Sequence, residues 1–214
     1  KMQRFGYDLK NFSITEHSNL IPKRDKYFIL SIIKKETRDS LLSKMSDEII
    51  MDYLDLAVRS SKIYVFSCSL EKQIIGYAIL ADKPKFLISE FYELKNKIFF
   101  SLLFNFRLLT ILDLIFSILK FDILTNPKKD IETFNQNLNL NLIAISEEHQ
   151  SKGYGSEFLE QILQIFKDKK KFKFLFCETF SKEAEKFYVN KFNFTSCGKK
   201  FRTSGILKVL QKKL

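Results

Sequence analysis

The sequence predicts a mixed α/β fold, with a mostly antiparallel central sheet flanked by helices, from three observations. Two helical segments precede a pair of strand-like runs, at residues 62–69 and 74–81, that are joined by a short polar turn. A further strand-like run at residues 138–145 leads through a glycine-bearing loop into an amphipathic helix. Another strand, a helix and a final strand pair follow. The 214 residues suit one domain, predicted to span residues 1–214.

The first half of the chain supplies the helices and the hairpin. Residues 7–14 can form a first strand, and apolar spacing from Tyr27 to Ile33 predicts a first helix. Ser46, followed by two acidic residues, marks the N-terminus of a second helix. The run KIYVFSCS is rich in β-branched and aromatic residues, as strands are, and IIGYAILA returns as its hairpin partner.

The second half begins with the strand at residues 138–145. The helix after it carries apolar residues at spacings near 3.6, namely Phe158, Leu159, Ile162, Leu163 and Phe166. We then expect a strand at 172–178, a helix from Ser181 to about residue 190, and a pair of strands at 192–197 and 205–210.

Residues 85–137 form an insertion between the third and fourth strands, and its centre, residues 98–121, is strongly apolar. Its length approaches that of a membrane span, but Arg107, Asp113 and Lys120 interrupt it at a cost within a bilayer. Four alternatives remain: packing on the core or a second subunit, a membrane-surface anchor, a true span, or a mobile lid. Protein burial, including a homodimer formed through this helical insertion, is the favoured interpretation.

The chain is basic, with 36 Lys and Arg against 25 Asp and Glu and a formal net charge of +11. Such a balance can indicate nucleic acid or an anionic membrane as partner. The lysines are scattered rather than gathered in one block, so no nucleic-acid partner is expected. A basic surface would still attract an anionic cofactor.

Three cysteines, Cys68, Cys177 and Cys197, lie in strand-like apolar runs and are expected to be small buried hydrophobes rather than a disulfide framework. No spacing resembles a metal site, and no signal peptide is recognised, so a cytoplasmic protein without a metal is expected. His17 lies in a polar segment and is expected to be exposed to solvent.

The loop after the fourth strand has the composition of an anion site. Gly153 and Gly155 allow the backbone to approach a ligand closely, and the helix that follows presents N–H groups without intrahelical partners. No Gly-Lys-Ser/Thr sequence ends the loop, and its two glycines fall short of the three that a dinucleotide fingerprint needs. The expected ligand of this loop is a pyrophosphate group.

The same loop resembles the Gln/Arg-x-x-Gly-x-Gly/Ala signature of the GNAT superfamily of N-acetyltransferases, which bind acetyl-CoA. Gln150, Gly153 and Gly155 match this signature residue for residue. A second half-signature follows at the expected separation, in the residues Ser181, Ala184, Phe187, Tyr188, Phe192, Asn193 and Phe194. Ser181 stands where the family usually has Asn, and Asn193 where it usually has Gly. The second departure is mild because Asn tolerates a left-handed backbone.

The resemblance implies an acetyl-CoA-dependent N-acetyltransferase whose acceptor is a primary amine of a small molecule, an amino sugar or a protein. The alternative is a non-catalytic protein that keeps the fold to bind coenzyme A or to dock on a membrane. Tyr188 falls on the position of the general acid that protonates the departing thiolate. The candidates for the general base are Glu147, Glu148 and Glu178, of which Glu178 is favoured. The residues that the resemblance assigns to the cofactor are Ile143, Ala144, Ile145, Gln150, Ser151, Lys152, Gly153, Tyr154, Gly155, Ser181 and Phe187.

Overall fold

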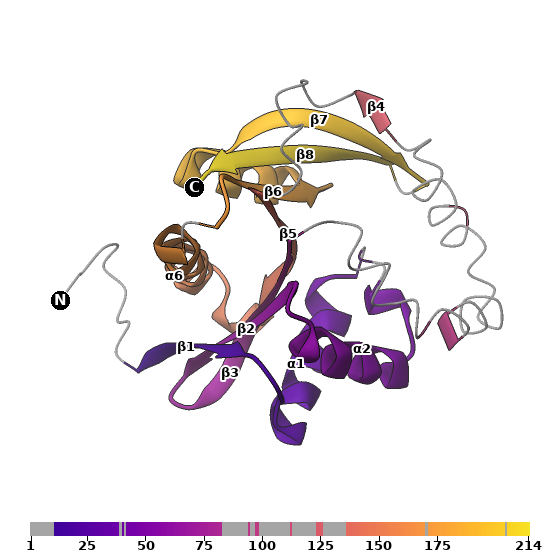
Figure 1. Cartoon of the computed structure of the whole chain (residues 1–214), viewed down its shortest axis with the longest axis vertical. Helices are drawn as coiled ribbons and strands as arrows, with labels where there is room; N and C mark the ends of the chain where they lie inside the picture. The colour runs from indigo at the N-terminus through magenta and orange to yellow at the C-terminus, as the bar shows by residue number, and fades with distance from the viewer. Residues whose placement is uncertain are drawn as a thin grey trace. The chain divides into compact units, whose positions relative to one another are not determined.

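The computed structural model describes residues 11–38, 40, 42–82, 94, 97–98, 112, 123–125, 136–169, 171–203 and 205–214 (Figure 1). The chain divides into two compact units. The first unit comprises Lys1–Leu80 and Leu142–Lys170, and the second comprises Ala81–Asn141 and Lys171–Leu214.

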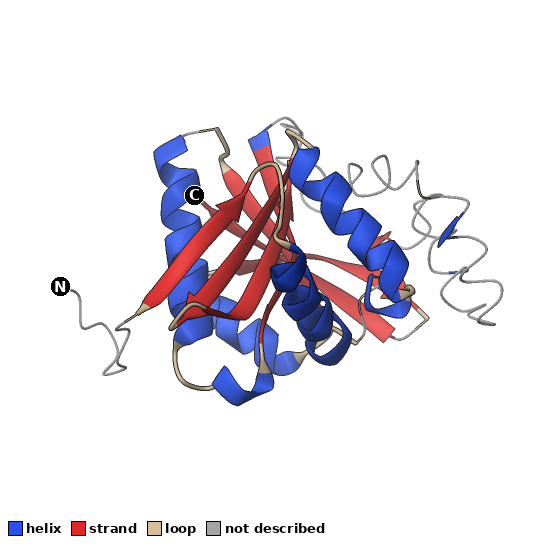
Figure 2. Cartoon of the chain, turned by 90° about the horizontal axis from the view of Figure 1, so that it is seen from below, coloured by secondary structure: helices blue, strands red, loops and turns tan. Residues whose placement is uncertain are grey.

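The first unit combines strands β1 (Phe12–His17), β2 (Ile63–Leu70) and β3 (Gln73–Ala81) with helices α1 (Lys23–Glu36) and α2 (Asp47–Arg59). Strands β1 and β2 pair antiparallel, from Phe12 opposite Leu70 to His17 opposite Val65. The strands follow the order β1-β2-β3-β5, and α1 and α2 pack against each other (Figures 1 and 2).

Helix α2 begins where the sequence predicts. The Ser46 hydroxyl caps it by accepting a hydrogen bond from the Ile49 N–H, and Asp47 and Glu48 lie in its first turn. A short 3-10 turn, η1 (Leu42–Lys44), connects α1 to α2. The two helices bury one apolar face each, lined by Ile29, Leu30, Ile32, Ile33, Ile49, Ile50, Tyr53, Leu54, Ala57 and Val58.

Strand β5 (Asn137–Ile145) leads into the glycine-bearing loop. Its last residues belong to the first unit, where the Ser146 N–H donates to the Ile75 carbonyl at 2.7 Å. A 3-10 turn, η4 (Glu147–His149), and helix α6 (Tyr154–Lys169) follow. The predicted apolar residues of α6 are buried: Phe158, Leu159, Ile162, Leu163 and Phe166.

The second unit holds the start of β5 beside β6 (Phe174–Thr179), with which it pairs in parallel. Strands β7 (Thr195–Arg202) and β8 (Gly205–Lys213) form a long antiparallel hairpin, and β4 (Ile123–Thr125) pairs with β7. The order of these strands is β5-β6-β8-β7-β4. After β6 come the short helix α7 (Lys182–Lys186) and a π-helical turn, η5 (Phe187–Lys191).

The predicted mixed fold with its mostly antiparallel sheet is confirmed, but several details of the prediction are wrong. The first strand starts at Phe12 and ends at His17, beyond the predicted end at residue 14, whereas the first helix, Lys23–Glu36, includes the predicted residues 27–33. The helix predicted from residue 181 to 190 divides into α7 and η5. His17 is only 8% exposed, because β1 continues to residue 17 and pairs it opposite Val65 within the sheet.

Most of the insertion at 85–137 lies outside the described residues. Its proposed packing in a homodimer, on a membrane surface, through a membrane or as a lid therefore stays a prediction, as does a single domain over 1–214. Among the residues that the structure describes, no helix combines the length and apolarity needed to cross a bilayer.

Candidate active site

The glycine-bearing loop has a distinctive backbone. Ser151 has φ 60° and Gly153 has φ 82°, so the chain turns twice through the left-handed region before α6 begins at Tyr154. Glycine adopts this conformation without the cost that a Cβ imposes, which explains the residue at position 153. Upstream, the Ser146 hydroxyl and His149 Nδ1 lie 3.0 Å apart and close the 3-10 turn η4.

The N–H groups of this loop are available to a ligand. In the described part of the chain, the N–H groups of residues 151–155 donate no hydrogen bond. Those on either side are used: Gln150 N–H donates to the Glu147 carbonyl, and Ser156 N–H donates to the Gly153 carbonyl. These donors lie at the start of a 16-residue helix, so the positive end of the helix dipole adds to their attraction for an anion.

The Gln150 side chain forms hydrogen bonds with both β5 and α1. Its Nε2 donates to the Ile145 carbonyl and to Glu36 Oε2, both at 2.8 Å. Glu36 Oε1 also accepts the Glu147 N–H at 3.0 Å. Glu36 was not predicted as a site residue, because an acidic residue near the end of a helix carries no sequence signal of its own.

The last residues of β5 are packed tightly against β3. A Cβ added at Gly76 would lie 2.7 Å from the Ala144 carbonyl oxygen and 2.4 Å from Ile145 Cδ1, so only glycine fits there. Ile143 and Ala144 are half-buried and Ile145 is buried. Gly76 was also missed, although a glycine inside a strand pattern can signal such a close approach of two backbones.

Tyr188 is a buried aromatic residue of the π-helical turn in the second unit. It is 7% exposed, and its ring centroid lies 5.4 Å from that of Phe187 and 5.2 Å from that of Phe194. Burial raises the pKa of its phenol, so the hydroxyl keeps its proton at neutral pH. Asn193 follows with φ 55°, the left-handed backbone that the sequence predicted for it.

The predicted acidic residues differ in their surroundings. Glu178 is exposed at the end of β6 and forms an ion pair with Lys200, at 2.5 Å between Oε1 and Nζ. Glu147 is exposed in η4, and its backbone N–H donates to the Glu36 carboxylate.

Ser181 caps helix α7. Its hydroxyl oxygen accepts the Ala184 N–H at 3.1 Å, and the hydroxyl donates to Glu183 Oε2 at 2.8 Å. The family-type Asn at this position would have a longer reach. A role for Ser181 in cofactor binding stays a prediction.

The predicted site residues fall into two groups. The first unit brings together Ile143, Ala144, Ile145, Glu147, Gln150, Ser151, Lys152, Gly153, Tyr154 and Gly155. The second unit holds Glu178, Ser181, Phe187 and Tyr188. Within the first group, Lys152 Nζ donates to the Glu148 carbonyl, and the ring of Tyr154 stacks on Phe12. Because these two side chains already have partners, the loop presents mainly backbone N–H groups.

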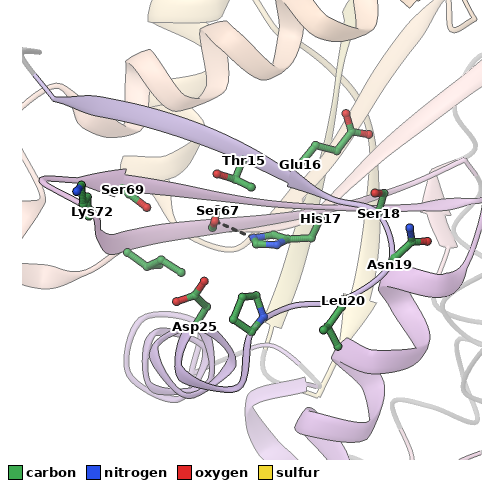
Figure 3. Close-up of a pocket in the computed structure, with 12 residues that line it drawn as sticks. Thr15, Glu16, His17, Ser18, Asn19, Leu20, Asp25, Ser67, Ser69 and Lys72 are labelled. Atoms are coloured by element: carbon green, nitrogen blue, oxygen red, sulfur yellow. Dashed lines mark hydrogen bonds between the residues drawn. The ribbon is translucent and has the colours of Figure 1, made fainter.

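A separate polar cavity of about 430 Å³ lies in the first unit between the β1–β2 sheet and the start of α1 (Figure 3). His17 and Ser67 form its buried wall, with His17 Nε2 and Ser67 Oγ 2.8 Å apart. Burial lowers the pKa of His17, and Asp25 opposes this shift more weakly. None of the predicted site residues lines this cavity.

The three cysteines lie in strands β2, β6 and β7. Cys68 and Cys177 are buried as predicted, and burial raises the pKa of both thiols; Cys197 is half-buried and donates to the Val209 carbonyl. All three are free thiols. Within the described ranges, no three His, Cys, Asp or Glu side chains are grouped to hold a metal.

Comparisons with known proteins agree with this geometry. Residues 121–194 match the model of the Acetyltransferase (GNAT) family. An N-acetyltransferase from Staphylococcus aureus Mu50 has a similar fold, with a TM-score of 0.58, 14% identity, and coverage of 95% of this chain and 99% of that one. A ribosomal-protein-alanine N-acetyltransferase from Brucella melitensis has a TM-score of 0.56 at 15% identity, covering 94% and 99%.

A third structure, a GNAT family acetyltransferase from Elizabethkingia anophelis with acetyl-CoA bound, has a TM-score of 0.50 at 14% identity, covering 96% of this chain and 99% of that one. No curated protein matches the sequence. The fold is thus that of the GNAT acetyltransferases, and residues 121–194 carry the sequence model of the family. The resemblance to the GNAT superfamily is confirmed, and acetyl transfer is the general class of activity that it supports.

Proposed function

We propose that the protein is an acetyl-CoA-dependent N-acetyltransferase that acts on a primary amine. The observation that carries this proposal is the loop at residues 151–155, whose N–H groups are unused in the described structure and precede α6. The charge of a pyrophosphate suits this set of N–H donors at a helix N-terminus. The acetyl-CoA bound by the Elizabethkingia anophelis protein supports the same ligand here.

The backbone of residues 143–145 would hold the pantetheine arm as an added strand, and an N–H there would stabilise the oxyanion of the tetrahedral intermediate. Gly76 supports this role because it lets Ala144 and Ile145 approach β3 closely and fixes their backbone. When bound, acetyl-CoA supplies the thioester that is attacked. The chain supplies position and proton transfer.

Two proton transfers complete the reaction. Tyr188 is proposed to protonate the departing thiolate, since its phenol carries a proton at neutral pH. The acceptor amine must lose a proton, and Glu147 or Glu178 would take it directly or through water. Glu147 lies beside the loop, whereas Glu178 already pairs with Lys200.

The acceptor belongs to the broad class of small-molecule amines, amino sugars and protein amines. Acetyl-CoA turnover, followed as free thiol, should be measured across polyamines, amino sugars, aminoglycosides and peptides with free N-termini. Turnover with any amine supports the proposal. Coenzyme A binding without turnover on the whole panel would favour the alternative, a non-catalytic protein that retains the fold and binds the cofactor.

A further inference from the structure

Glu36 connects the last turn of α1 to the loop that precedes α6. Its two carboxylate oxygens are used separately: Oε1 accepts the Glu147 N–H at 3.0 Å, and Oε2 accepts from Gln150 Nε2 at 2.8 Å. The same Nε2 donates to the Ile145 carbonyl at 2.8 Å. One side chain thus joins the entry of the loop, its glutamine and the end of β5, across more than a hundred residues of sequence.

The C-terminal end of α1 fixes the position of the Glu36 carboxylate. Thr37, the next residue, ends the helix: its hydroxyl donates to the Ile33 carbonyl at 2.8 Å and lies 3.2 Å from the Tyr77 hydroxyl. Tyr77 is fully buried in β3. Because α1 is anchored to β3 at this point, Glu36 is presented to the loop from a rigid position rather than from a free helix end.

The charge of Glu36 is unfavourable to the ligand proposed for this loop. A carboxylate bonded to Gln150 and to the Glu147 N–H repels a nearby pyrophosphate. Any benefit of this residue to anion binding must therefore come from geometry. We propose that Glu36 is a positioning residue of the coenzyme A site, which fixes Gln150 and the loop entry so that the N–H groups of residues 151–155 stay aimed at the pyrophosphate; this rests on the proposed function.

Two substitutions test geometry against charge. In Glu36→Gln, one terminal atom becomes a donor, so it can no longer accept from both the Glu147 N–H and Gln150 Nε2. If the Gln150 amide turned to accept instead, its bond to the Ile145 carbonyl would be lost. Glu36→Asp keeps the charge but is one methylene shorter, so it cannot reach both donors.

Each variant should bind coenzyme A and ADP about three- to tenfold more weakly than the wild type, the usual effect of losing one such hydrogen bond. If Glu36 acted only through its charge, Glu36→Gln would bind these anions more tightly than the wild type, and Glu36→Asp would bind them with unchanged affinity. Acetyl-pantetheine lacks the pyrophosphate, so its kcat/KM as acetyl donor should stay within about twofold of the wild-type value.

Calorimetry with coenzyme A and ADP and turnover with acetyl-pantetheine measure these effects on the full chain. Glu71→Gln is the matched control, since it removes one negative charge from an exposed turn of the same unit. Thermal unfolding identifies a variant that is not folded, in which case the other Glu36 variant decides. Weaker binding of both pyrophosphate ligands, with acetyl-pantetheine unaffected, supports the inference.

Unchanged or tighter binding of coenzyme A by the folded Glu36 variants overturns the inference, and so does an equal loss with acetyl-pantetheine, which would indicate a general structural defect. A wild-type protein that does not bind coenzyme A would instead overturn the proposed function. The two failures are therefore distinguished by the wild-type titration.

Discussion

Replacing Gly76 with alanine tests the close packing of β3 against the end of β5. The new Cβ would lie 2.4 Å from Ile145 Cδ1, 2.8 Å from Cys68 Sγ and 2.7 Å from the Ala144 carbonyl oxygen. The two side-chain atoms can turn away at some cost. The carbonyl oxygen moves only if the strand moves, so the backbone proposed to bind pantetheine would be displaced.

Overpacking of this kind usually costs about 1–3 kcal/mol, and three simultaneous contacts below 3 Å place Gly76→Ala in the upper part of this range, about 2–3 kcal/mol. For a chain of 214 residues this corresponds to a fall in Tm of about 4–12 °C. Denaturant unfolding and calorimetric melting measure both quantities. Affinity for coenzyme A should fall in parallel, since Ala144 and Ile145 shift.

Gly155→Ala is the control for this experiment. A Cβ at Gly155 would lie 3.5 Å from Ile145 Cγ1, an ordinary contact, and the residue is in the first turn of α6. Alanine favours a helix over glycine by up to about 1 kcal/mol, so this variant should be as stable as the wild type or more so. A Gly76→Ala protein with wild-type stability would refute the packing argument.

Three further substitutions have defined outcomes. Tyr188→Phe should lower kcat about ten- to a thousandfold and leave coenzyme A affinity nearly unchanged, because only proton donation is lost; wild-type turnover would make Tyr188 a packing residue. Burial lowers the pKa of His17, so the unfolded chain binds a proton that the native protein does not, and the free energy of unfolding should fall as pH drops below about 6.5. His17→Gln should flatten this slope in denaturant titrations between pH 7.5 and 5, and an unchanged slope would exclude His17 as its source. Ser181→Ala should lower the free energy of unfolding by about 1 kcal/mol through loss of the cap on Ala184 N–H, and an unaltered melting curve would count against that cap.

The loop was predictable from sequence because its determinants are local. The apolar spacing of α6, the glycine at position 153 and the cap at Ser46 act within a few residues, and the structure follows them. Asn193 likewise takes the left-handed backbone expected of it. Local rules of helix start and glycine conformation therefore sufficed for the part of the candidate site built from one continuous segment.

The missed features depend on contacts between distant segments. Glu36 reaches Glu147 across 111 residues, and Gly76 is needed only because Ala144 and Ile145 approach it from another strand. His17 was expected in solvent, but its burial depends on pairing with β2. Sequence periodicity records which face of an element is apolar, and it carries no information on which side chain of a distant element meets a given loop.

The central claim is that the loop at residues 151–155 binds the pyrophosphate of coenzyme A, and a calorimetric titration tests it most directly. Wild-type protein should bind coenzyme A, and Gly153→Asp should bind it at least about thirtyfold more weakly, about 2 kcal/mol, because it adds a negative charge beside the pyrophosphate. The variant also places a side chain where φ is 82°. Equal affinity of the wild type and a folded Gly153→Asp protein would contradict the claim, as would a wild-type protein that does not bind coenzyme A.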